Sequence, residues 1–256
     1  MLSSTSLTLL AATLLSTLPT NAQDSSSSGK RGLVYVPSSA GHLDDDQIWI
    51  DTDLTWYYNY QASPTTKFDD SQMEFVPMMW GQPEDGDDML FYNTVSQLVE
   101  DGRDINYVLG FNEPDGCGAQ VYGGSCIPAE TAAELWIREI EPLKEEYNIS
   151  LGAPGVTGSP DGFIWLEQWF EACNGGCNPD FIPVHWYGNF EGLASHIGQV
   201  HDAYENMTMW VTEYAFANGE LEESQDFYQM SANWFDTELP YVASISKPPK
   251  NLQPPI

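Results

Sequence analysis

Tyr107-Val108-Leu109-Gly110-Phe111-Asn112-Glu113-Pro114 is a run of β-forming residues that ends in a carboxylate. Met209-Trp210-Val211-Thr212-Glu213-Tyr214 repeats this arrangement much later in the chain. In a parallel barrel the carboxyl ends of the strands converge on one mouth, so residues far apart in sequence can face each other there. The two runs therefore predict two parallel strands whose terminal glutamates, Glu113 and Glu213, share one site.

Similar β-rich runs alternate with amphipathic stretches along most of the chain. The β-rich runs cover residues 33–37, 55–60, 74–80, 107–114, 150–156, 181–188 and 209–216. The helical stretches cover residues 90–101, 128–147, 163–173, 193–206 and 224–239. This alternation predicts a parallel sheet, and seven or eight such units predict closure into an α/β fold of the (β/α)8 TIM-barrel type. No Gly-x-Gly-x-x-Gly pattern follows the first run, which disfavours an open nucleotide-binding sheet.

The end of the domain departs from this pattern. Residues 241–246 are the candidate eighth strand, and they lead directly into Lys247-Pro248-Pro249-Lys250. Proline stops both strand pairing and helix formation. We therefore expect a barrel over residues 31–246 that is incomplete at its eighth β/α unit, followed by a Pro-rich tail at 247–256.

The first 22 residues carry no charge, contain a Leu-rich run and end in Thr20-Asn21-Ala22, which predicts a signal peptide. Residues 23–30 form a Ser-rich linker. No later segment approaches the ~20 apolar residues that span a bilayer. We therefore expect a secreted protein, extracellular or in the cell wall, with N-glycosylation acceptors at Asn148 and Asn206.

The chain has four cysteines, which agrees with a secreted protein that contains disulfides. Cys117 and Cys126 flank a Gly-rich loop, and Cys173 and Cys177 enclose Asn-Gly-Gly, so we predict two local disulfides. The rival interpretation is a zinc site, but the spacings lack the doubled two-residue gaps of a zinc ribbon, and secretion favours oxidation.

The charge balance narrows the class of partner. With 38 acidic and 8 basic residues, the formal net charge is −30 at pH 7, which repels nucleic acid and anionic membranes. The acidic runs at 44–46 and 84–88 lack the ligand spacing of a calcium loop. We expect no metal, no cofactor, a neutral partner, and the best activity at acidic pH, where part of the self-repulsion is removed.

Paired glutamates at strand ends are typical of glycosidases. Cleaving an acetal needs one carboxyl group to protonate the leaving oxygen and a second to attack the anomeric carbon or activate water. Pro114 is expected to hold Glu113 extended. Strand alternation is expected to send Val211 and Glu213 to the same side.

Aromatic side chains with polar edges suit sugars. Trp80 ends the third run, and His185-Trp186-Tyr187 ends the sixth, so we expect Trp80, Trp186 and Tyr187 to form an aromatic wall at the same mouth. No Ser or Cys nucleophile motif lies beside His185, which favours a hydrogen-bonding role to substrate or to a neighbouring group. Five other tryptophans, at 49, 56, 136, 165 and 169, are expected in the core or in helix packing.

The order of these motifs resembles fungal glycoside hydrolase family 128. That family comprises retaining β-1,3-glucanases with a TIM-barrel fold in clan A. The segments that carry the resemblance are 109–115 (Leu-Gly-Phe-Asn-Glu-Pro-Asp), 133–136 (Ala-Glu-Leu-Trp), 151–154 (Leu-Gly-Ala-Pro), 180–188 (Asp-Phe-Ile-Pro-Val-His-Trp-Tyr-Gly) and 210–214 (Trp-Val-Thr-Glu-Tyr).

The resemblance implies Glu113 as acid/base, Glu213 as nucleophile, Asn112 in contact with the sugar, and Tyr187 near the nucleophile. A retaining enzyme requires carboxyl groups ~5–5.5 Å apart, and an inverting one ~6.5–9.5 Å. We expect a monomeric endo-β-1,3-glucanase that acts on cell-wall glucan. The alternative is a non-catalytic β-glucan-binding protein, in which a truncated barrel fails to align the carboxylates.

Overall fold

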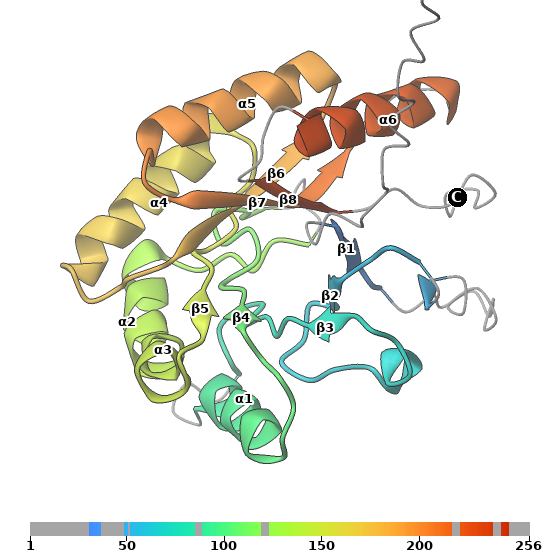
Figure 1. Cartoon of the computed structure of the whole chain (residues 1–256). Coiled ribbons are helices and arrows are strands. Elements are labelled where there is room, and N and C mark those ends of the chain that lie inside the picture. The colour runs from blue at the N-terminus through green and yellow to red at the C-terminus, as the bar shows by residue number, and fades with distance from the viewer. Residues whose placement is uncertain are drawn as a thin grey trace, which may run out of the picture.

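A computed structural model describes residues 31–36, 49–50, 52–84, 89–118, 123–216, 221–237 and 242–245 (Figure 1). The expected signal peptide, the Ser-rich linker and the Pro-rich tail lie outside these residues. So do the acidic run at 44–46 and most of the run at 84–88.

Within the described residues, eight short strands form two parallel sheets. The strands are β1 (Arg31–Val34), β2 (Trp56–Tyr58), β3 (Glu74–Phe75), β4 (Tyr107–Val108), β5 (Ser150–Leu151), β6 (Phe181–Tyr187), β7 (Thr208–Ala215) and β8 (Val242–Ile245). One sheet has the order β3-β2-β1-β8-β7-β6, and the other pairs β4 with β5. β8 lies parallel between β1 and β7, so the expected eighth strand is present.

Single parallel bridges join the two sheets. Met78 bridges to Leu109 after β3, and Gly152 bridges to Phe181 after β5, so strand neighbours follow chain order around the molecule. The predicted runs 74–80, 107–114 and 150–156 are longer than the observed strands. Pro77 interrupts the run 74–80 and Pro154 the run 150–156, because proline cannot donate to a strand ladder. The parallel strand order expected of a barrel is therefore present, but hydrogen-bonded pairing is not continuous from β3 to β4 or from β5 to β6.

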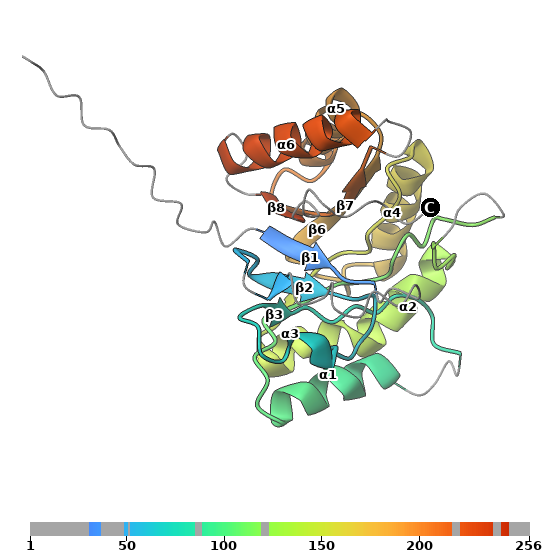
Figure 2. The same ribbon diagram turned by 90° about the vertical axis from the view of Figure 1, so that its right-hand side faces the viewer.

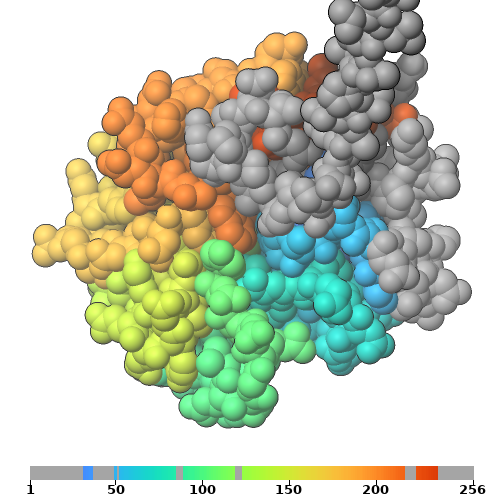
Figure 3. All heavy atoms as spheres, in the orientation of Figure 1, coloured from blue at the N-terminus to red at the C-terminus, as the bar shows by residue number. Residues whose placement is uncertain are grey.

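In the described part of the chain, six α-helices lie outside the strands, mainly around β4 to β8 (Figures 1 and 2). They are α1 (Leu90–Glu100), α2 (Ala129–Glu139), α3 (Glu141–Tyr147), α4 (Pro160–Cys173), α5 (Phe190–Ala203) and α6 (Leu221–Thr237). With all atoms drawn, the elements run round the visible surface from cyan through green and yellow to orange (Figure 3). Between β2 and β3 there is a short 3-10 helix, η2 (Thr66–Phe68).

Some helix boundaries differ from those predicted from the apolar pattern, because a proline or a capping side chain sets them. The stretch 128–147 forms two helices, because Pro142 lies in the first turn of α3 and cannot donate a bond back into α2. Ser159 and Asn189 accept hydrogen bonds from Gly162 and Gly192, which starts α4 and α5 earlier than the apolar pattern indicates.

Two apolar clusters fill the fold. The inner cluster, enclosed by the strands, consists of Trp56, Tyr58, Val76, Met78, Leu109, Phe181 and Trp210. Within it the Trp210 ring lies 4.4 Å from Phe181 and 4.9 Å from Trp56, measured between ring centroids. The outer cluster contains Trp136 and Trp169, both with no exposed surface. Each such ring removes roughly 150–250 Å² from water, which makes aromatic packing a main source of stability.

All four cysteines form the predicted disulfides, Cys117–Cys126 and Cys173–Cys177, which excludes a zinc site on free thiols. Asn148 follows α3 and Asn206 follows α5; both are exposed and precede strands, at the opposite end from the strand-terminal glutamates. Their glycosylation stays a prediction. Among the described residues, no helix has the length and apolar character needed to cross a membrane.

Candidate active site

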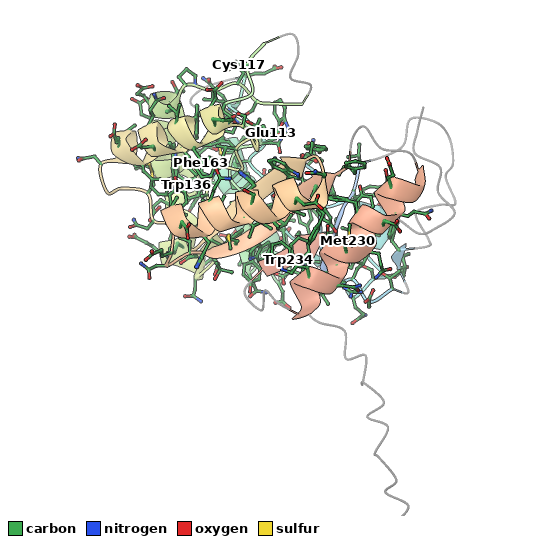
Figure 4. All side chains as sticks on the ribbon, turned by 90° about the horizontal axis from the view of Figure 1, so that it is seen from above. Glu113, Cys117, Trp136, Phe163, Met230 and Trp234 are labelled. Atoms are coloured by element: carbon green, nitrogen blue, oxygen red, sulfur yellow. A yellow bond between two sulfur atoms is a disulfide. The ribbon has the colours of Figure 1, made fainter. Side chains whose placement is uncertain are left out.

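Glu113, after β4, and Glu213, in β7, meet at the carboxyl ends of the strands together with His185 of β6. Each of the three offers one side-chain oxygen or nitrogen, and these atoms lie within 4.8 Å of one another. Their exposed fractions are 8%, 7% and 1%. Figure 4 shows Glu113 beside the loop that carries Cys117. The expectation that the two glutamates share one site is met in the geometry.

Two tyrosine hydroxyls hold the Glu213 carboxylate. Tyr60 donates to one oxygen and Tyr187 to the other, each at 2.8 Å. Burial and the charge of Glu213 raise the pKa of both phenols, so both stay protonated and donate. This carboxylate therefore has a fixed orientation.

Sequence reasoning placed Tyr187 near Glu213 and missed Tyr60. The missed residue ends the predicted run 55–60, as Trp80 ends the run 74–80, so its position at a strand end was an available signal. Its backbone φ of 60° is unusual for a residue other than glycine. Tyr187 is 57% exposed, so its ring also faces the open side of the site.

His185 lies between the carboxylates. Its Nδ1 is 3.0 Å from Glu113 Oε1 and 3.7 Å from Glu213 Oε2. Burial acts to lower the pKa of this imidazole, but the Glu213 charge and the hydrogen bond and charge of Glu113 outweigh burial and raise it. A proton on Nδ1 then makes a charge-assisted hydrogen bond to Glu113.

This raised pKa predicts a pH-dependent part of the stability. Because the folded-state pKa of His185 lies above its unfolded value of about 6.5, its contribution is fully present below that value and is lost as pH rises through the folded-state pKa. We expect His185→Asn to flatten the decline in unfolding free energy as pH rises above about 6.5. Urea denaturation of both proteins across this range measures the difference, and parallel curves would contradict the ion pair.

The backbone at Glu113 is not extended, contrary to the expectation from Pro114. Its φ is 40°, in the left-handed region, and not the extended conformation that the following proline favours. The Glu113 N–H donates to Gly155 O at 2.7 Å, and its carbonyl accepts from Gly116 N at 2.9 Å. These bonds turn the chain sharply at Glu113, and they offset a conformation that costs of order 1–3 kcal/mol.

The expectation that Val211 and Glu213 lie on the same side of β7 was also wrong. Val211 pairs with Val184, but Glu213 pairs with His185, so Thr212 is an extra residue in β7. Val211 packs in the outer cluster, whereas Glu213 reaches Tyr60, which packs against the inner cluster. Such a bulge re-aims the side chains that follow it, and here it separates the directions of Val211 and Glu213.

Asn112 and Trp80 lie next to Glu113. The Asn112 N–H donates to Trp80 O at 2.9 Å, and its side-chain Nδ2 donates to Gly123 O at 2.9 Å. Asn112 Oδ1 is buried and has no protein partner within the described part of the chain. Trp80 is 41% exposed and lines a cavity of about 410 Å³ whose wall also includes Tyr60 and Leu90.

Trp186 lies on the other face of β6. Its indole N–H donates to Asn189 O at 3.1 Å, and its ring stacks on His196 of α5 with centroids 5.4 Å apart. The structure thus brings Glu113, Glu213, His185, Tyr187 and Asn112 together, places Trp80 at the adjoining cavity, and directs Trp186 away.

Glu113, His185 and Glu213 form the one cluster of three possible metal ligands found in the described residues. A metal requires a deprotonated imidazole nitrogen. The raised pKa of His185 and its hydrogen bond to Glu113 oppose that state, and Tyr60 and Tyr187 already donate to both oxygens of Glu213. The cluster therefore fits acid–base chemistry better than metal binding.

Comparison with known proteins identifies a matching family. Residues 32–247 match the model for the family described as glycosyl hydrolase catalytic core. Among curated proteins, no relative matches the chain.

Several solved structures are similar. A subgroup I endo-β-1,3-glucanase of glycoside hydrolase family 128 from Amycolatopsis mediterranei, in complex with laminaritriose, is 27% identical over 85% of this chain and 87% of its own, with a TM-score of 0.63. A subgroup III curdlan-specific exo-β-1,3-glucanase from Blastomyces gilchristii is 25% identical over 85% and 88%, with a TM-score of 0.67. A subgroup VII oligosaccharide-binding protein from Trichoderma gamsii, 22% identical over 86% and 82% with a TM-score of 0.63, shares the fold.

Proposed function

Because the chain belongs to the glycosyl hydrolase catalytic core family and, within it, to glycoside hydrolase family 128, we propose that it hydrolyses β-1,3-glucan with retention of anomeric configuration. In this proposal Glu113 is the acid/base and Glu213 is the nucleophile. The observation that carries it is the approach of the two carboxylates: an oxygen of one lies within 4.8 Å of an oxygen of the other. Inverting enzymes need a separation of ~6.5–9.5 Å to hold a water between the carboxyl groups.

In the first step, Glu213 attacks the anomeric carbon while Glu113 transfers its proton to the departing glycosidic oxygen. The carbon–oxygen bond breaks, and a glycosyl ester forms on Glu213. Tyr60 and Tyr187 hold the attacking carboxylate, and orientation of this kind is a large part of catalysis.

In the second step, Glu113 accepts a proton from water, and the resulting hydroxide equivalent attacks the anomeric carbon and releases Glu213. His185 remains beside both carboxylates throughout. Its charge stabilises whichever glutamate is ionised: Glu213 before the attack, and Glu113 once its proton has left.

The sugar chain would lie across the exposed aromatic residues at this mouth. Trp80 offers a ring face at the cavity, Tyr187 offers a partly exposed ring, and the unpartnered Asn112 Oδ1 can accept a hydrogen bond from a sugar hydroxyl. We include endo action in the proposal, as the Amycolatopsis relative is endo-acting. We also propose that the protein is monomeric and secreted, and the two disulfides fit an oxidising compartment.

The test is release of reducing sugar from a soluble β-1,3-glucan, with a β-1,4-glucan as the matched control. We expect hydrolysis of the β-1,3-linked polymer, with oligosaccharide products of several lengths and retention of configuration by NMR. Folded protein that binds β-1,3-glucan without cleaving it would overturn the proposal and favour a glucan-binding protein. Glucose as the sole early product would overturn endo action alone.

A further inference from the structure

Residues 112–117 form the turn that carries Glu113. A second segment, residues 123–127 and here called the clamp segment, lies against this turn. Three hydrogen bonds join them: Ser125 N to Asn112 O at 2.9 Å, Asn112 Nδ2 to Gly123 O at 2.9 Å, and Ile127 N to Pro114 O at 3.0 Å. These bonds lie on both sides of Glu113 in the sequence. The clamp segment therefore restrains the turn before and after the carboxylate.

The clamp segment and the turn are also in direct contact. A Cβ atom added at Gly124 would lie 2.9 Å from Glu113 O and 2.6 Å from Gly116 O, closer than real Cβ contacts. No side chain fits there without moving the backbone that bears Glu113. The Cys117–Cys126 disulfide links the end of the turn to the clamp segment covalently.

The opposite side of the turn is held by α4 and the loop before it. Asp115 accepts from the Thr157 N–H at 2.9 Å and also from the Thr157 hydroxyl. The indole of Trp165 donates to Ile127 O at 2.9 Å, which ties the clamp segment to α4. The left-handed Glu113 is thus restrained from several directions, as a strained residue requires.

We propose that the Cys117–Cys126 disulfide and the clamp segment are a positioning device for the Glu113 carboxylate, required for proton transfer but not for the nucleophilic attack by Glu213. This inference rests on the proposed function, because it assigns Glu113 the acid/base role. Glu213 has separate supports, Tyr60 and Tyr187, which the clamp segment does not contact through any of the bonds above. Opening the clamp is therefore expected to impair one carboxylate selectively.

The chain supplies its own control. Cys173–Cys177 is also a local disulfide, but it joins the last residue of α4 to the loop before β6, at the far end of the strands. We compare Cys117→Ser/Cys126→Ser with Cys173→Ser/Cys177→Ser. Gly124→Ala displaces the turn while the disulfide stays intact, and Gly198→Ala in α5, where an added Cβ meets nothing within 4 Å, is its control.

Two substrates separate acid/base positioning from general damage. β-1,3-glucan needs a proton on its leaving oxygen, whereas a 2,4-dinitrophenyl β-laminaribioside releases a stable anion without one. Azide replaces water in the second step and needs no general base, giving a β-glycosyl azide. A device that positions Glu113 affects kcat on glucan and spares the dinitrophenyl reaction in azide.

We expect Cys117→Ser/Cys126→Ser and Gly124→Ala to lower kcat on β-1,3-glucan by roughly 10–100-fold, because displacements near 1 Å cost about that much. The dinitrophenyl rate in azide should stay close to that of the natural sequence. The Cys173/Cys177 and Gly198 variants should keep both rates. Circular dichroism and thermal unfolding verify that each variant is folded at the assay temperature.

The outcomes are distinguishable. If the natural sequence cleaves neither substrate, the proposed function fails, and this inference fails with it. If the natural sequence is active but the folded clamp variants keep full glucan activity, or lose both reactions equally, the positioning device is refuted and the proposed function stands.

Discussion

Glu213→Gln is expected to lower kcat on β-1,3-glucan by at least ~10⁴-fold, since removal of a catalytic nucleophile has effects of that size or larger. The amide keeps the shape of the carboxylate but cannot form the glycosyl ester. Tyr60 and Tyr187 each donate to one carboxylate oxygen, and in the variant one of these hydroxyls must turn to accept from the amide nitrogen. A phenol hydroxyl can do so, and the variant should therefore fold and bind the oligosaccharide. Reducing-sugar assays give kcat, and titration calorimetry with a β-1,3-gluco-oligosaccharide gives binding.

The same variant provides the test of Trp80. Because Glu213→Gln does not consume the oligosaccharide, adding Trp80→Ala should weaken its binding through loss of the exposed ring at the cavity. Met230→Ala, at an exposed position on α6, is the matched control and should leave affinity unchanged. Full hydrolytic activity in Glu213→Gln would end the assignment of the nucleophile, and unchanged affinity in the double variant would remove Trp80 from the site.

Glu113→Gln is expected to lower kcat on β-1,3-glucan by roughly 10²–10⁴-fold, the usual contribution of general acid–base catalysis. The amide cannot supply a proton, so substrates whose leaving group needs one are most affected. The dinitrophenyl laminaribioside should react at nearly the natural rate once azide replaces water as the acceptor. A β-configured glycosyl azide as product would support retention through a Glu213 ester.

His185 offers a control for this experiment. His185→Asn removes the hydrogen bond to Glu113 and leaves both carboxylates in place, so the dinitrophenyl reaction in azide should remain. If Glu113→Gln lost the glucan and dinitrophenyl reactions to the same extent, Glu113 would not be the acid/base. The proton donor would then have to be sought among the other groups at this mouth.

Local rules were sufficient for much of the fold. The alternation of β-rich and amphipathic stretches predicted every strand and most helices, and the spacing of the cysteines predicted both disulfides. The strand-end positions of Glu113, Glu213, His185 and Tyr187 were enough to predict that these residues meet. In each case the decisive property is carried by residues adjacent in sequence.

The finer geometry of the site depends on contacts between distant segments. Glu113 adopts a left-handed φ against the preference that Pro114 imposes, because Gly155, Thr157 and the clamp segment hold the turn around it. Tyr60 ends the run 55–60, which locates it at the same mouth, but its contact with Glu213 depends on its left-handed φ of 60° and on the relative placement of β2 and β7.

The sequence alone therefore determined the order of strands and helices, the disulfide pairs and the two carboxylates, since periodicity, caps and residue chemistry are local properties. The tertiary structure alone decided where the side chains point. The extra residue Thr212 turns Glu213 away from the side that Val211 faces, and packing of Trp186 on His196 of α5 decides which face of β6 carries Tyr187 to Glu213. Strand register is set by packing between segments, and one added residue reverses the faces that follow.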